Sequence, residues 1–139
     1  MIRTRLDVVV QVKERAEEKA GVSLAKAESV VTTAKQKLEL ARQAASNDTR
    51  TRSDISLWEM TELAHQRALT DAQKAQKELE TAQKSAAQFR ASYLNAHRNA
   101  EVVRRVADSR RDELTKEMTR AEDKQADEAA SLAWFRKAG

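Results

Sequence analysis

The sequence lacks cysteine and proline and contains little glycine and few aromatic residues. Glycine occurs only at Gly21 and Gly139, and aromatic side chains account for 4% of the 139 residues. The lack of cysteine excludes a disulfide framework and any thiolate metal site. Because proline is absent and glycine is rare, the chain has almost no helix-breaking residue, and because bulky rings are few it cannot fill a thick globular core. These absences favour long helices over a deep interior.

Acidic and basic residues are nearly balanced. The 26 Lys and Arg residues exceed the 22 Asp and Glu residues by a formal charge of +4, and the two signs alternate along the chain, as on the solvated surface of a helix. Two basic pairs about one heptad apart could contact phosphates, but three nearby carboxylates neutralise them. The pairs are Arg104–Arg105 and Arg110–Arg111, and the carboxylates are Asp108, Asp112 and Glu113. No apolar run is long enough to span a membrane. We therefore expect neither a nucleic-acid partner nor membrane insertion.

Mostly apolar residues recur at steps of three and four over two long stretches of the chain. The first series is Ile2, Leu6, Val9, Lys13, Ala16, Ala20, Leu24, Ala27, Val31, Ala34, Leu38, Ala41 and Ala45. The second series is Trp58, Thr61, His65, Ala68, Ala72, Ala75, Leu79, Ala82, Ala86, Phe89, Tyr93, Ala96, Ala100, Val103, Ala107, Arg110 and Leu114. Alternating steps of three and four are typical of coiled-coil helices, so the chain is expected to form two of them.

The pattern of apolar residues at steps of three and four is interrupted once, at residues 46–54, which read SNDTRTRSD. The Ser, Asn and Asp side chains there compete with helical backbone hydrogen bonds, and Ser53 or Asp54 is a good N-cap for the next helix. A short connection between two helices with apolar seams makes them antiparallel neighbours. The sequence therefore predicts an all-α fold with two long helices in an antiparallel coiled-coil hairpin. We expect a single domain over 1–139, with helix 1 at about 2–45, a turn at about 46–54 and helix 2 at about 55–137.

The two predicted helices differ in length, at about 65 Å and about 125 Å. If Ala45 faces the region of Ile55, Ile2 and Leu6 face roughly Tyr93–Arg98, and about forty C-terminal residues extend without an intrachain partner. This overhang exposes an apolar stripe that suits docking to a partner, and self-association is the alternative. Most of the packing energy is expected from the larger side chains, namely Trp58, Leu79, Phe89, Tyr93 and Leu94.

The sequence lacks the common motifs of catalytic and ligand-binding sites. The chain has no glycine-rich phosphate loop, no G-x-S-x-G elbow and no cysteine nucleophile. His65 and His97 are too far apart on one helix to form a metal pair. The acidic cluster near the C-terminus fits a solvated face better than a metal site, and its members are Glu122, Asp123, Asp127 and Glu128. We expect no catalytic, cofactor or metal site and no enzyme activity. Trp134 and Phe135 form either a partner anchor or an incidental helix cap.

Several segments together resemble a known family. These are Leu6, Val9 and Val10, the charged runs Lys13-Glu14-Arg15 and Glu17-Glu18, and then Ala20, Leu24 and Ala27. Near the end, the run 122–129, EDKQADEA, resembles an E-x-K-x-x-D-E-x-A tail, and Trp134-Phe135-Arg136-Lys137 is compatible with it. With the two-helix layout, these segments resemble the FliJ/YscO (SctO) stalk proteins of type III secretion systems, of the flagellum or of virulence. The resemblance covers nearly the whole chain.

The resemblance implies a function that involves binding to other proteins and no catalysis. Such proteins bind the pore of the hexameric secretion ATPase, link it to the export gate protein and in some cases escort secretion chaperones. They are cytoplasmic and peripheral to the secretion apparatus at the inner membrane. By this analogy the ATPase-binding residues are Arg3, Arg5, Lys13, Arg15, Arg120, Lys124, Asp127 and Glu128. The export-gate contact is Leu38, Trp58, Leu63 and Ala68.

Two other functions stay open from the residues alone. The first is a homotypic coiled-coil scaffold or adaptor without an ATPase partner, in which the C-terminal overhang pairs with its copy. The second is a basic binder of nucleic acid or of a membrane surface, whose binding would depend strongly on salt.

Overall fold

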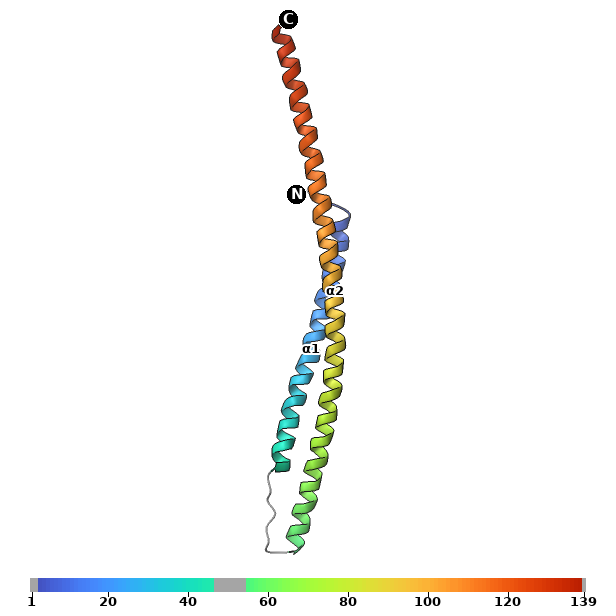
Figure 1. The fold of residues 1–139 in the computed structure, drawn as a ribbon, viewed down its shortest axis with the longest axis vertical. Helices are drawn as coiled ribbons and strands as arrows, with labels where there is room; N and C mark the ends of the chain where they lie inside the picture. Colours follow the sequence, from blue (N-terminus) through green and yellow to red (C-terminus); the bar gives the residue numbers. More distant parts are fainter. Residues whose placement is uncertain (1–2, 47–54, 139) are drawn as a thin grey trace. The chain divides into compact units, whose positions relative to one another are not determined.

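The structure, a computed structural model, describes residues 3–46 and 55–138, which form two α-helices (Figure 1). Helix α1 (Leu6–Ser46) has 41 residues and helix α2 (Ile55–Ala138) has 84. The two helices pack antiparallel, and no strand occurs in the described ranges. The predicted all-α hairpin fold is therefore confirmed. The predicted turn lies outside the described residues from residue 47 onward, as do its N-cap candidates Ser53 and Asp54.

The chain divides into two compact units, and each combines a stretch of α1 with a stretch of α2. The terminal unit consists of Met1–Glu17 and Ala96–Gly139, and the hairpin unit consists of Glu18–Asn95. Each unit is described by itself below. The single domain over 1–139 stays a prediction.

Helix α1 begins at Leu6, later than the predicted start near residue 2, because the Asp7 side chain caps the backbone of Thr4. The backbone N–H of Thr4 donates to Asp7 Oδ2 at 2.9 Å, and the backbone N–H of Asp7 donates to the Thr4 carbonyl at 3.1 Å. A Thr whose backbone N–H is bound by an acidic side chain three residues on marks the N-terminus of a helix. The motif T-x-x-D at residues 4–7 was therefore the relevant start signal.

The core of the hairpin unit is a narrow layer of small side chains. Its members are Ala34, Leu38, Ala75, Leu79 and Ala82, with Val31 and Ala41 packed against them. Of the large residues expected to dominate packing, only Leu79 is buried, while Trp58, Phe89 and Leu94 are exposed and Tyr93 is half-buried. That expectation was wrong, because alanine seams bring helices close together and leave bulky rings no space between them.

Gly21 shows the same close approach. A Cβ atom at this position would lie 3.5 Å from the Tyr93 ring, an ordinary contact distance. The ring therefore packs directly over the helix backbone at Gly21.

The register of the two helices differs from the predicted one. In the hairpin unit, Lys37 pairs with Glu78 at 3.1 Å and Glu28 with Arg90 at 3.4 Å. In the terminal unit, Leu6 lies in a groove with residues 105–113 instead of facing residues 93–98. The packing of Leu38 and Ala34 against Ala75, Leu79 and Ala82 sets the register, so α2 does not start level with the end of α1. The unpaired C-terminal stretch is correspondingly shorter than predicted.

Candidate functional site

The terminal unit contains a stretch of α2 that no part of α1 covers. Leu114 is the last half-buried residue of α2, and every residue from Thr115 to Ala138 is exposed. Because this stretch has no helix packed on it among the described residues, its side chains are available to a partner. We call residues 115–138 the free stretch.

The sequence-predicted ATPase-binding residues all lie in the terminal unit. Seven are exposed, and Lys13 is half-buried where α1 meets α2. Arg3, Arg5, Lys13 and Arg15 come from the N-terminal end of the chain, and Arg120, Lys124, Asp127 and Glu128 lie on the free stretch. The fold therefore brings two sets that are distant in sequence into one compact unit.

The two aromatic side chains near the C-terminus pack on each other. The rings of Trp134 and Phe135 meet edge to face, with centroids 5.4 Å apart and an interplanar angle of 77°. Both residues are about two-thirds exposed, at 65% and 67%. Edge-to-face contact is a favourable arrangement of aromatic rings, so the pair forms a pre-arranged apolar surface on the free stretch.

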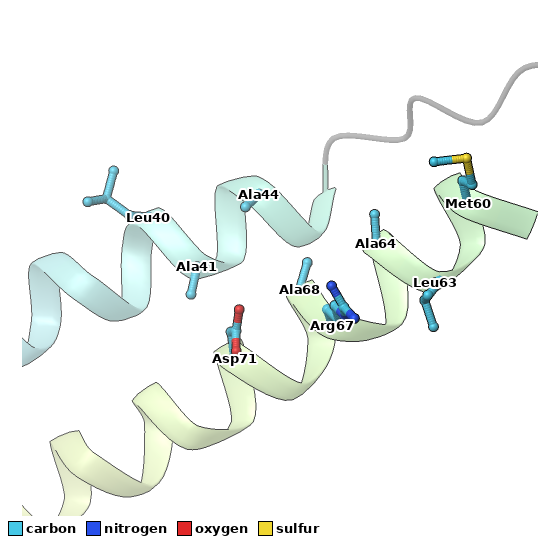
Figure 2. Close-up of a pocket in the computed structure, with 9 residues that line it drawn as sticks. All are labelled: Leu40, Ala41, Ala44, Met60, Leu63, Ala64, Arg67, Ala68 and Asp71. Carbon is cyan, nitrogen blue, oxygen red and sulfur yellow. The ribbon is translucent and has the colours of Figure 1, made fainter. Parts of the chain in front are cut away.

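A groove lies in the hairpin unit, near the C-terminal end of α1 and the N-terminal part of α2 (Figure 2). Its volume is about 560 Å³, and it is lined by Leu40, Ala41, Ala44, Met60, Leu63, Ala64, Arg67, Ala68 and Asp71. Ala41, Ala64 and Ala68 point into the space between the helices, whereas Leu63 points away from α1. The lining is largely apolar, with one basic and one acidic side chain.

The sequence-predicted export-gate residues are placed unevenly around this groove. Leu63 and Ala68 line it, and Trp58 is exposed on the first turns of α2. Leu38 instead belongs to the core of the hairpin unit and is only 5% exposed. Leu40 and Met60, which sequence reasoning did not select, are exposed on the groove.

A network of charged side chains joins α1 to α2 in the terminal unit. One carboxylate oxygen of Glu17 lies 2.7 Å from His97 Nδ1, and the other accepts a hydrogen bond from Arg104 Nη2 at 2.6 Å. Arg104 Nε also lies 3.2 Å from Glu14, and Arg111 Nη2 donates to Asp7 at 2.6 Å. The Glu17 side chain is only 17% exposed, so this is a partly buried network.

Two carboxylates of the network have shifted acidities. The hydrogen bond from His97, together with the charge of Arg104, holds the pKa of Glu17 below its ordinary value of 4.5. The backbone N–H of Thr4, together with Arg111, holds the pKa of Asp7 below 3.8. In both cases the donors favour the ionised carboxylate.

Sequence reasoning missed this network because it placed the wrong residues on the contact face of α1. Val9 and Ala16 were expected there, but both are exposed, and Val10 and Glu17 occupy the less exposed positions. A charged Glu17 within an apolar rhythm looks like a surface residue. The available signal was its spacing, because Leu6, Val10, Lys13 and Glu17 also follow steps of three and four.

Within residues 3–46 and 55–138, no group of three or more His, Cys, Asp or Glu side chains is placed to hold a metal ion. Neither helix, over the same residues, has a stretch that is both long and apolar enough to cross a membrane.

Comparison with known proteins gives one match. A family model described as "Flagellar FliJ protein" matches residues 2–139, and thus includes both helices. No curated protein and no solved structure matches the chain.

Proposed function

Because the chain belongs to the flagellar FliJ protein family, whose members are stalk proteins of flagellar and type III protein export, we propose that it links two parts of an export machine. In this proposal it binds the pore of the hexameric secretion ATPase and connects it to the export gate, with secretion chaperones as further partners. It performs no catalysis itself and works in the cytoplasm, at the periphery of the apparatus on the inner membrane.

The exposure of the free stretch in the terminal unit is the main observation that supports the proposed ATPase contact. It presents charges of both signs on a stretch of helix whose residues are all exposed, including Arg120, Lys124, Asp127 and Glu128, and carries the Trp134–Phe135 pair near its end. Mixed charges around an aromatic anchor suit a protein interface, since the aromatic group supplies binding energy and the charges supply register. Arg3 and Arg5 add exposed positive charge in the same unit.

The groove of the hairpin unit supports the export-gate contact. It is lined by the apolar side chains of Leu40, Met60, Leu63 and Ala68, and Trp58 is exposed at the start of the same helix α2. An apolar groove between two helices accepts the apolar face of a third segment. Leu38 contributes by holding the two helices together beneath this surface.

Charge reversal at the N-terminal end tests the ATPase contact. The triple variant Arg3→Glu, Arg5→Glu, Lys13→Glu is expected to lose measurable binding to the purified ATPase hexamer while keeping its helical circular dichroism. The matched control reverses three exposed lysines of the hairpin unit, Lys19, Lys26 and Lys77, and is expected to bind normally. Equal binding by the triple variant and the unsubstituted chain would remove the proposal.

Self-association is the second candidate function, because the free stretch also carries exposed apolar side chains. Met118, Leu132 and Phe135 are more than half exposed and continue the seam of α2 beyond Leu114. Pairing of two free stretches would cover them. Sedimentation equilibrium distinguishes the candidates, since a homotypic scaffold dimerises at micromolar concentration and a stalk stays monomeric.

A further inference from the structure

The N-terminal end of α1 is attached to α2 by a different chemistry from the rest of α1. We call residues Leu6–Glu17 the arm. The buried residues of α1 are Ala27, Ala34 and Leu38, and none of them lies in the arm. Three apolar side chains of the arm, Val8, Val9 and Val12, are between 41% and 64% exposed. The arm therefore leaves much of its apolar surface in solvent.

Charged contacts hold the arm in place. Asp7, Glu14 and Glu17 each pair with α2, at 2.6 Å to Arg111, 3.2 Å to Arg104 and 2.6 Å to Arg104. Two arginines of α2 therefore connect to three carboxylates that are spread over the whole arm. The apolar part of this attachment consists of small or half-buried side chains. Leu6 and Val10 are the large apolar residues of the arm that are half-buried, and α2 buries Ala100 and Ala107 in the same unit.

The hairpin unit provides the comparison. Its interhelical ion pairs, Lys37–Glu78 and Glu28–Arg90, have side chains at least 53% exposed, so solvent weakens them. In that unit the buried residues Leu38 and Leu79 hold the helices together instead. Salt should affect the two attachments differently, because ions screen charge pairs and leave apolar packing in place.

We propose that the arm is an electrostatic latch, which an acidic surface opens by competing for Arg104 and Arg111. Opening would uncover Ala100 and Ala107, the two least exposed residues of α2, together with the adjacent Val103. The uncovered face would then continue directly into the free stretch and lengthen the docking surface of α2. The inference concerns the arm alone and does not depend on binding to an ATPase.

Hydrogen–deuterium exchange of the full chain tests the latch. Raising NaCl from 0.05 to 0.5 M should speed exchange of amides 11–17 about five-fold, because salt screens the ion pairs that hold the arm. Amides 27–41 should not respond. Fraying of the helix end would mainly affect the first turn of α1, where Asp7 forms the cap. Amides 11–17 lie beyond that turn, so their exchange reports on the arm and not on fraying.

A matched pair of variants identifies the responsible contact. Glu17→Gln should speed exchange of the arm at low salt and reduce its salt response, because it removes one of the three carboxylates that pair with α2 while keeping the side-chain size. Glu28→Gln, which removes an exposed ion pair of the hairpin unit, should leave the arm unchanged. Circular dichroism verifies that both variants remain helical.

Poly-L-glutamate is the acidic probe. At constant ionic strength it should accelerate exchange in the arm of the unsubstituted chain, and an uncharged polymer of equal length should not. Three results would each overturn the latch: an arm insensitive to salt, equal effects of Glu17→Gln and Glu28→Gln on the arm, or no response to poly-L-glutamate.

Discussion

At the residue scale, the contribution of an apolar side chain depends on its position relative to the seam between the helices. Leu38 and Leu40 lie two residues apart on α1, yet Leu38 is 5% exposed and Leu40 is 66% exposed. Leu38 packs with Leu79 and three alanines, whereas Leu40 borders the groove. The two leucines therefore offer a comparison within one helix.

Leu38→Ala should lower the free energy of unfolding by about 2–3 kcal/mol, since it removes one of the few bulky side chains of the core. Leu40→Ala, its matched control, should change it by less than about 0.5 kcal/mol. Urea denaturation followed by circular dichroism measures both values. Similar losses for the two variants would show that the described core does not hold the helices together.

Acid should loosen the terminal unit through Glu17 and Asp7. Their pKa values are lower in the folded chain than their ordinary values of 4.5 and 3.8, so the folded chain binds these protons less readily than the unfolded chain. Their stabilisation is fully present above those ordinary values and is lost as the pH falls through the lowered folded values. Proton titration by NMR should show both shifts, and Arg104→Gln should move the pKa of Glu17 back towards 4.5. An unchanged Glu17 titration in that variant would contradict the pairing.

At the element scale, the sequence predicted the existence of both helices and most of the seam of α2. Alanines at steps of three and four, such as Ala75, Ala82, Ala100 and Ala107, are indeed buried. The start of α1 was misplaced because the apolar pattern carries no sign of the hydrogen bond from the Thr4 backbone to Asp7. Its contact face near Glu17 was also misplaced, because a partly buried ion pair has no apolar signature in the sequence.

The register could not be obtained from the sequence for a physical reason. Many of the residues along the two seams are alanines, so sliding one helix by a turn exchanges alanine for alanine. Only the few larger residues, such as Leu38 and Leu79, distinguish one register from another. For the candidate sites, the positions on the free stretch were correctly expected to be exposed. The burial of Leu38 agrees with its place in the apolar series of the first helix.

The free stretch should depend on helix propensity more than any paired part of the chain. The double variant Ala126→Gly, Ala129→Gly costs about 1 kcal/mol per substitution, and no packed helix offsets this cost. NMR Cα chemical shifts should therefore show loss of helix around these residues. The matched variant Ala87→Gly, Ala91→Gly in the hairpin unit should keep its helical shifts and lower the global stability instead. Retained helix in the first variant would imply a partner for the free stretch.

At the scale of the whole molecule, both units consist of a stretch of α1 packed on a stretch of α2, but different interactions hold the two helices together in each unit. Apolar packing dominates in the hairpin unit, and ion pairing contributes more in the terminal unit. A stalk that contacts different partners through different units could use this difference, since each unit responds to a different solution condition.

The aromatic pair should contribute strongly to the proposed ATPase contact. Replacing Trp134 and Phe135 with Ala should weaken binding by about 2 kcal/mol or more, as for aromatic anchors at other interfaces. Trp58→Ala in the hairpin unit is the control and should leave ATPase binding unchanged. Isothermal titration calorimetry against the hexamer measures both. Equal affinity of the double variant and the unsubstituted chain would limit Trp134 and Phe135 to an incidental helix cap.

The most direct test of the stalk proposal is photo-crosslinking of the chain inside living cells. A photoreactive amino acid is placed at Arg5, at Lys124 or at Trp58, one position per strain. The proposal predicts crosslinks to the secretion ATPase from the first two positions, and from Trp58 crosslinks to the export gate and none to the ATPase. Crosslinks from Arg5 and Lys124 only to a second copy of this chain would contradict the proposal.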